Sequence, residues 1–286
     1  MFQSKSRIRL IKSLLAVSVV AFLLFNQAAD AGTHKKTDEQ LSEEIKSNDL
    51  LTRTVALDYI NRNSKNEPFN KETIEQILLL AEKLRKDTEY TTKGELGESY
   101  YSALLDALGN TRDPRAIPYL IENLGGTAVS RGLLKIGAAA IDPLIVKLHS
   151  DVVGYRASAA QSLGFFLKPD DNQYFNNNEM KDKIKKAFLD ELKDPRNKNP
   201  DLGIDWYEHR ASERASVRRS ILQGLGYLAL SGDNDVLFLI KSAAEEDPYY
   251  LDMSKKTNYT GPKKRYMVRE EAQKILDSLK ANAQNK

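Results

Sequence analysis

Apolar residues recur along most of the chain with the three- and four-residue spacing of amphipathic helices. One phrase occurs three times within residues 98–167: Leu105-x-x-Leu108-Gly109, Leu133-x-x-Ile136-Gly137 and Ala160-x-x-Leu163-Gly164. Its copies begin 28 and 27 residues apart, a period typical of stacked helical hairpins. A single hairpin of this size is too small to bury its own apolar face, so adjacent hairpins are expected to stack against one another.

The pattern predicts an all-α solenoid of about five to six helical hairpins over residues 49–281. The expected helix pairs are 49–63 with 70–85, 98–108 with 115–124, 127–136 with 139–148, and 151–167 with 180–192. A fifth unit contains Arg218-x-x-Ile221-Leu222-x-x-Leu225-Gly226 and a helix over 233–246, and the helix that follows has no partner. Residues 88–97 are expected to form a loop, residues 282–286 a tail, and no segment shows the alternation of a strand.

Glycine and aspartate mark the ends of the expected helices. Most glycines fall near a predicted helix end, where glycine commonly terminates a helix. Aspartates stand at predicted helix starts, where capping of the first turn explains them. The aspartates in question are Asp113, Asp151 and Asp233.

The first 31 residues have the pattern of a signal peptide. Basic residues precede an apolar run from Leu14 to Phe25, and a small-x-small ending follows it. Cleavage is expected after Ala31, which gives an exported, periplasmic or secreted protein, with residues 32–48 as a mobile leader. The alternative is an uncleaved anchor, but a twelve-residue run spans only about 18 Å of a hydrocarbon core of roughly 30 Å.

Charge and composition exclude several classes of protein. The chain has 286 residues, with 43 basic and 40 acidic ones. Residues 1–31 contain four of the basic residues and one acidic residue, so the rest of the chain is formally neutral and has no general attraction for nucleic acid. The absence of cysteine excludes disulfides, thiolate metal sites and a cysteine nucleophile.

The repeated units resemble short HEAT-like repeats of the phycobilisome-lyase group. The resemblance rests on Asp151…Tyr155-Arg156-x-x-Ala159-Ala160-x-x-Leu163-Gly164, Val217-Arg218-x-x-Ile221-Leu222-x-x-Leu225-Gly226 and Asp113-Pro114-Arg115-Ala116-Ile117-Pro118-Tyr119-Leu120. It implies that arginines and aspartates of successive units form a buried or half-buried ladder. The positions concerned are Arg156, Arg218, Arg269, Asp113 and Asp151, with Arg53 as a further candidate. The resemblance implies no activity, because function depends on sites rather than folds.

The sequence offers little material for catalysis or metal binding. The three histidines are His34, His149 and His209, and no two of them have the spacing of metal ligands. Gly-rich phosphate loops and nucleophile elbows are also absent from the sequence. We therefore expect no metal, no cofactor and no catalytic residues.

Two insertions, residues 194–212 and 247–264, interrupt the repeat. Each follows a second helix and precedes a first helix, so the two are expected to be neighbours along one edge of the solenoid. They are rich in the aromatic and basic residues that binding sites favour. The candidate binding residues are Trp206, Tyr207, His209, Arg210, Tyr249, Tyr250, Tyr259 and Tyr266. The alternative is that these side chains only cover adjacent helices.

These features favour a non-enzymatic module for protein–protein interaction or scaffolding in a bacterial cell envelope. The expected partner is a protein, with no nucleic acid, and with membrane contact only through an uncleaved signal peptide. One alternative is an enzyme or enzyme-accessory subunit with a site between the insertions, which titratable side chains around His209 would favour. Another is a cell-wall glycan binder, which requires an exposed Trp206 ring.

Overall fold

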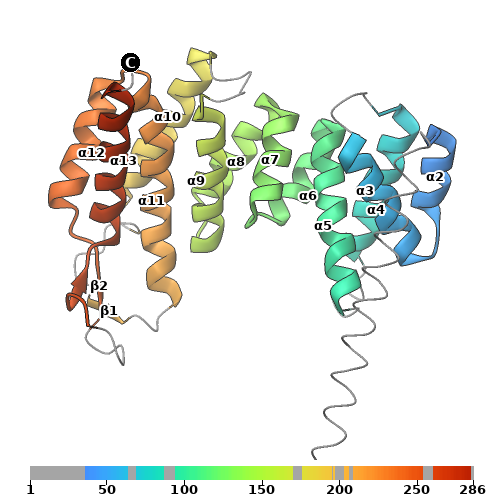
Figure 1. The fold of residues 1–286 in the computed structure, drawn as a ribbon, viewed down its shortest axis with the longest axis horizontal. Coiled ribbons are helices and arrows are strands. Elements are labelled where there is room, and N and C mark those ends of the chain that lie inside the picture. Colours follow the sequence, from blue (N-terminus) through green and yellow to red (C-terminus); the bar gives the residue numbers. More distant parts are fainter. Residues whose placement is uncertain are drawn as a thin grey trace, which may run out of the picture. The chain divides into compact units, whose positions relative to one another are not determined.

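The computed structural model describes residues 36–63, 69–86, 94–169, 176–194, 196, 203–205, 209–253 and 260–284 (Figure 1). It is built of stacked helical hairpins, and it confirms the predicted all-α solenoid. The chain divides into two compact units, Met1–Leu104 and Leu105–Lys286. The boundary between them falls within one helix, α5 (Gly94–Thr111).

The first unit has a small apolar core beneath three helices and the beginning of α5. The helices are α2 (Asp38–Lys46), α3 (Leu50–Asn63) and α4 (Lys71–Lys86). Helix α2 packs on both α3 and α4. Fully buried side chains hold these helices together, among them Ile45, Leu57, Ile60, Ile77 and Tyr100.

Helix α2 corrects the expectation that residues 32–48 are a mobile leader. A capping box at Thr37 and Gln40 begins this helix, and such a box satisfies two backbone donors of the first turn. Leu41 and Ile45, one turn apart, are buried against the neighbouring helices. Two apolar residues at this spacing were therefore enough to fix a short amphipathic helix in a polar stretch. Residues 1–35, which include the predicted signal peptide, lie outside the described residues.

The second unit repeats the pattern of a first and a second helix. The first helices are α7 (Thr127–Ile136), α9 (Val153–Leu167), α11 (His209–Leu230) and α13 (Met267–Gln284). The second helices are α6 (Ile117–Glu122), α8 (Ile141–Leu148), α10 (Asn178–Lys193) and α12 (Asn234–Glu246). Short 3-10 turns, Pro114–Ala116 and Ala138–Ala140, precede α6 and α8. Helix α9 packs against α7 and α11, and α11 packs against α13, so the first helices form one layer (Figure 1).

Glycines inside the first helices allow this layer to pack closely, which differs from the predicted role of most glycines as helix ends. A Cβ atom on Gly109, near the end of α5, would lie 2.3 Å from the Cα of Gly132 on α7. A Cβ on Gly224 would lie 3.2 Å from the Cα of Gly164 and 2.6 Å from the ring of Phe188. Helix backbones therefore touch at these glycines.

The insertions add a small sheet, although the sequence showed no strand pattern. Its strands are β1 (Gly203–Asp205), β2 (Tyr250–Asp252) and β3 (Lys264–Arg265), in the order β1-β2-β3. Strand β1 is parallel to β2, with Ile204 opposite Leu251, and β3 is antiparallel to β2. Strands of two or three residues are too short to show alternation, which explains why the sequence did not reveal them.

Helix α5 begins earlier than predicted, within the expected loop 88–97.

Close packing at glycine makes a clear prediction for stability. We expect Gly109→Ala to lower the free energy of unfolding by about 1 to 3 kcal/mol, because the added methyl group meets backbone that must move away. Gly154→Ala is the matched control, since a Cβ there meets nothing within 4 Å, and alanine is the better helix former. Urea denaturation measures both changes. Equal stability of the two variants would contradict close backbone packing at Gly109.

A second prediction concerns Glu271, which joins α13 to α11. Burial raises the pKa of this carboxyl, but hydrogen bonds from Gln223 and Arg219 outweigh burial and leave the pKa of Glu271 below its usual value. A lowered pKa in the folded state stabilises the protein above the unfolded pKa, and this contribution is lost as the pH falls through the folded pKa.

Glu271→Gln removes this titration while it keeps a similar shape. We expect the free energy of unfolding of the native protein to fall more steeply than that of the variant from about pH 5 downward. Urea denaturation at a series of pH values measures the two slopes. Parallel curves would show that Glu271 contributes nothing to the pH dependence.

Candidate protein-binding surface

The two insertions lie side by side, as the sequence predicted. The backbones of β1 and β2 pair directly, although 47 residues separate their opposed partners Ile204 and Leu251. Both insertions run from the end of a second helix to the beginning of the next first helix, so they cross the edge of the stack in the same direction. This repetition explains why β1 and β2 are parallel.

Asp247 attaches the sheet to the helices. It lies directly after α12, and its carboxylate is buried, with 1% of the side chain exposed. The carboxylate accepts hydrogen bonds from the guanidinium of Arg218 on α11, including one of 3.0 Å from Nε, and from the backbone N–H of Tyr249 at 3.1 Å. Its carbonyl oxygen accepts one from Nε of Arg269 on α13 at 2.7 Å. A buried charge is tolerated when it is paired in this way.

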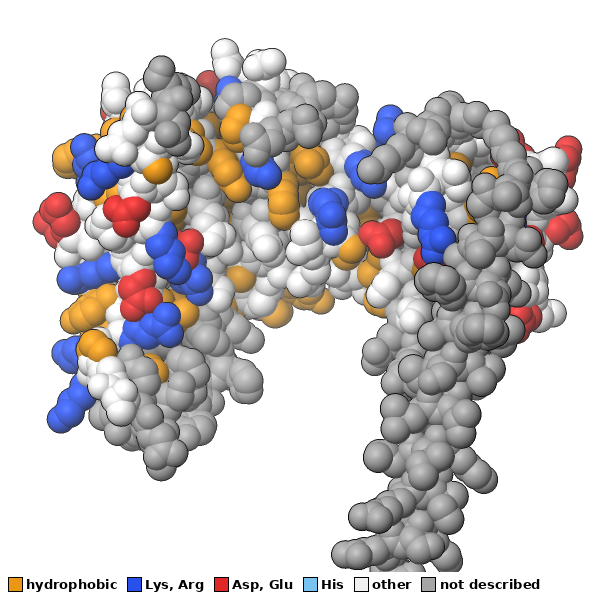
Figure 2. Space-filling view, viewed as in Figure 1, with side chains coloured by type: hydrophobic (Ala, Val, Ile, Leu, Met, Phe, Trp, Pro, Cys, Tyr) orange, Lys and Arg blue, Asp and Glu red, His pale blue; other side chains and the backbone are white. Residues whose placement is uncertain are grey.

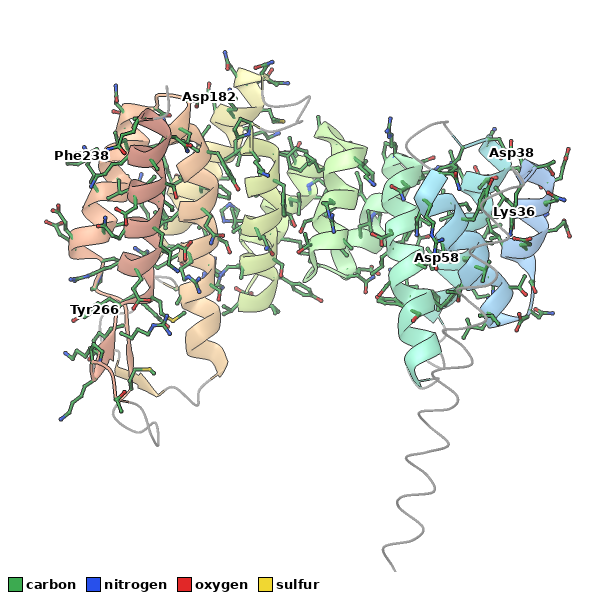
Figure 3. The ribbon with its side chains drawn as sticks, viewed as in Figure 1. Lys36, Asp38, Asp58, Asp182, Phe238 and Tyr266 are labelled. Carbon is green, nitrogen blue, oxygen red and sulfur yellow. The ribbon has the colours of Figure 1, made fainter. Side chains whose placement is uncertain are left out.

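Beyond Asp247, two tyrosines and two cations form a half-exposed cluster. The ring centroids of Tyr250 and Tyr266 are 5.7 Å apart, with their planes tilted by 50°. Nζ of Lys264 lies 4.4 Å from the centroid of the Tyr250 ring, and Cζ of Arg269 lies 4.3 Å from that of Tyr266. We call Tyr250, Lys264, Tyr266 and Arg269 the platform, and the exposed Lys263 directly precedes Lys264 in sequence. Figure 3 labels Tyr266 beside the sheet, at the beginning of α13.

The platform is basic as well as aromatic. Lys263 and Lys264 are exposed, and both tyrosines are partly exposed. Arg265, between Lys264 and Tyr266 in sequence, forms an ion pair with Glu270 at 3.0 Å. Figure 2 shows basic and hydrophobic side chains at this end of the second unit, with acidic side chains among them. Such a surface combines flat apolar contact with donors for charged groups, which is what protein-binding hot spots use.

The structure places the predicted binding residues in three groups. Tyr250 and Tyr266 belong to the platform. Tyr249, in contrast, is buried, with 2% of it exposed, so it does not offer a binding surface. The remaining candidates give no side-chain geometry: Trp206, Tyr207 and Tyr259 lie outside the described residues, and His209 and Arg210 are described only as the backbone that begins α11.

The arginines that resemble the family's ladder lie at equivalent positions on successive first helices. Arg156 on α9 is buried, and its Nε lies 3.3 Å from the carboxylate of Glu191. Arg218 on α11 pairs with Asp247, and Arg269 on α13 reaches the carbonyl of the same residue. In the first unit, the guanidinium of the buried Arg53 lies 5.1 Å from the centre of the Tyr100 ring.

The aspartates differ among themselves. Asp113 accepts a hydrogen bond from the backbone N–H of Arg115 at the start of its turn, and hydrogen bonds from the Arg115 side chain hold the pKa of Asp113 below its usual value. Asp233 caps α12 in the predicted way. Asp151 does not cap a helix: the N-cap of α9 is Val152, and the exposed Asp151 pairs with Arg196 at 2.9 Å.

Sequence reasoning missed the role of Glu191 and its contact with His149. Glu191 is fully buried on α10, and its Oε2 lies 2.9 Å from Nδ1 of His149, whose side chain is 43% exposed. A usable signal existed, because Glu191 continues the buried stripe of Met180, Ile184 and Phe188 at helical spacing. A carboxylate on an apolar stripe predicts a buried cationic partner, here Arg156, and the half-exposed His149 ring reaches the same carboxylate.

Within the described residues, no group of three or more histidines, aspartates or glutamates is placed to hold a metal ion. No helix in the described part of the chain is long and apolar enough to cross a membrane.

The role of Asp247 can be tested by truncation. We expect Asp247→Ala to lower the free energy of unfolding by about 3 to 5 kcal/mol, because it leaves Arg218 half-buried without its carboxylate. Asp277→Ala, at an exposed position of α13, should change stability by about 0.5 kcal/mol or less. Urea denaturation measures both. A similar loss in the two variants would rule out Asp247 as a structural junction.

Comparison with known proteins gives one family. The sequence profile of the family described as PBS lyase HEAT-like repeat matches residues 101–126, which include the end of α5, the Asp113 turn and α6. No curated protein matches the chain. The match covers one hairpin, and it agrees with the repeated helical hairpins of the structure. Together these findings support the HEAT-repeat family for this chain.

Proposed function

We propose that this chain is an exported, non-enzymatic HEAT-repeat protein that acts as a protein-interaction or scaffold module in the cell envelope. HEAT-like repeats suggest such a module, because stacked hairpins offer a long surface without any reactive group. Export is supported by the signal-peptide pattern of residues 1–31. The assignment as a non-enzyme rests on the absence of catalytic motifs from the sequence.

The observation that carries the proposal is the platform at the second insertion. Tyr250, Lys264 and Tyr266 lie together there, and the first insertion pairs its backbone with the same sheet through β1. All three side chains are at least partly exposed, so they are accessible to a partner.

The described geometry favours a protein partner over the alternatives. For glycan binding, the tyrosines would have to offer open ring faces to a sugar, but Lys264 lies over Tyr250 and Arg269 lies over Tyr266. The enzyme alternative depends on titratable groups around His209, whose side chain is outside the described residues. No observation on the described residues favours either alternative.

Export predicts a shortened chain in the cell envelope. When the full chain with a C-terminal tag is produced in its source organism, we expect the purified protein to begin at Gly32, because Ala31 ends the small-x-small pattern. N-terminal sequencing and cell fractionation measure the result. An intact N-terminus in the cytoplasmic fraction would contradict export.

Partner binding predicts a loss of defined crosslinks when the platform is changed. In the same cells, chemical crosslinking should capture specific proteins with the native chain, and these should be lost with Tyr266→Ala, because that variant removes an anchoring ring. Phe238→Ala is the control, since this ring on α12 is 74% exposed but lies outside the platform (Figure 3). If both variants retain the partners equally, the binding surface lies elsewhere than at the platform.

A further inference from the structure

The platform has cations that form no ion pair with a carboxylate whose side chain the structure describes, while Asp252, the register partner of Lys264, is described only as backbone. In the described part of the chain, no carboxylate forms an ion pair with Lys263, Lys264 or Arg269, whereas the neighbouring Arg265 and Arg218 are paired with Glu270 and Asp247. Arg269 donates instead to a backbone carbonyl. Lys264 and Arg269 lie over neighbouring rings and repel each other, and an anionic group bound there would relieve the repulsion.

The rings of Tyr250 and Tyr266 add apolar area to this positive surface. Lys264 and Arg269 lie over the faces of Tyr250 and Tyr266, so each cation is held at a ring and still has donors for further hydrogen bonds. A ligand with carboxylates and apolar groups in alternation would meet both features. A simple inorganic anion would use only the charges.

Part of the platform is held in place within the chain. The carbonyl of Asp247 holds the guanidinium of Arg269, and the backbone bond from Met253 N–H to Lys263 O, at 2.8 Å, continues the pairing of β2 with β3. Side chains that are already ordered lose less conformational entropy on binding. This arrangement is typical of a surface used for recognition.

The edge of the sheet favours an acidic segment in particular. Strand β3 is the outer strand of the described sheet, and it carries Lys264 beside Lys263. Lysines on an edge strand discourage pairing with arbitrary strands, but they attract an extended segment whose own side chains are acidic. The body of the protein is neutral, so the attraction is local to this edge.

We propose, on the basis of the function proposed above, that the platform binds an acidic, extended segment of a partner protein. Carboxylates of that segment pair with Lys264, Arg269 and the adjacent Lys263, and an apolar side chain of the segment packs against the parts of the Tyr250 and Tyr266 rings that the two cations leave exposed. The partner is thus defined by its chemistry: a run of aspartate or glutamate with an interposed apolar residue.

The test uses the full mature chain and a short fluorescein-labelled peptide in which glutamate alternates with serine around one central phenylalanine. Fluorescence anisotropy should show binding that weakens as the salt concentration rises from about 0.05 M to about 0.5 M. The double variant Lys263→Glu/Lys264→Glu should raise the Kd at least about tenfold, since charge reversal replaces attraction by repulsion. Lys241→Glu/Lys280→Glu is the matched control, because both lysines are exposed and lie outside the platform.

The possible results distinguish failure of the acidic-segment proposal from failure of the proposed protein-interaction function. Equal binding by the two double variants, or equal binding of a peptide with lysine in place of glutamate, would overturn the acidic-segment proposal. Vesicles of phosphatidylglycerol that bind through Lys263 and Lys264 when the peptide does not would replace it with a lipid surface. If the peptide fails but Tyr266→Ala still abolishes the cellular crosslinks, the interaction function stands and only the chemistry of the partner is wrong. Circular dichroism checks that each variant is folded.

Discussion

Asp247 lies at the end of α12 with its carboxylate buried, and it binds groups from three different parts of the chain. Arg218 comes from α11, Arg269 from α13, and the Tyr249 N–H from the residue before β2. A buried carboxylate is stable only while such partners are present. The relative positions of two first helices and of the sheet are therefore fixed together, and the platform depends on that junction.

The regular and irregular parts of the second unit have different roles. Contacts at glycine, such as Gly164 with Gly224, bring first helices together and make the stack rigid. The insertions use that rigid edge as a support, and the repeat makes them cross it in parallel. Stability is thus concentrated in the stack, and recognition in the segments that depart from it, so that surface residues can vary with little effect on folding.

The sequence was sufficient for the architecture and for the approximate position of the two insertions, because both depend on periodicity, although α11 begins at His209, inside the predicted insertion 194–212. Residues such as Leu163 and Leu225 recur at helical spacing, and both are fully buried. The roles of Gly109 and Asp247 were not predictable in the same way. Whether a glycine ends a helix or permits two backbones to touch depends on the next helix. Which carboxylate receives an arginine depends on distances between helices, and Tyr249 could not be assigned to the core rather than the surface without them.

The two insertions join in one sheet beside the platform, and an engineered cysteine pair tests this most directly. The native chain has no cysteine, so a disulfide in Ile204→Cys/Leu251→Cys reports only on this pair, whose backbones lie opposite each other in β1 and β2. Adjacent strands place Cα atoms within the range that a disulfide spans. Mild oxidation should give rapid, intramolecular crosslinking, and much slower crosslinking in the control Val146→Cys/Leu251→Cys. Equal rates in the two pairs would contradict a joint sheet.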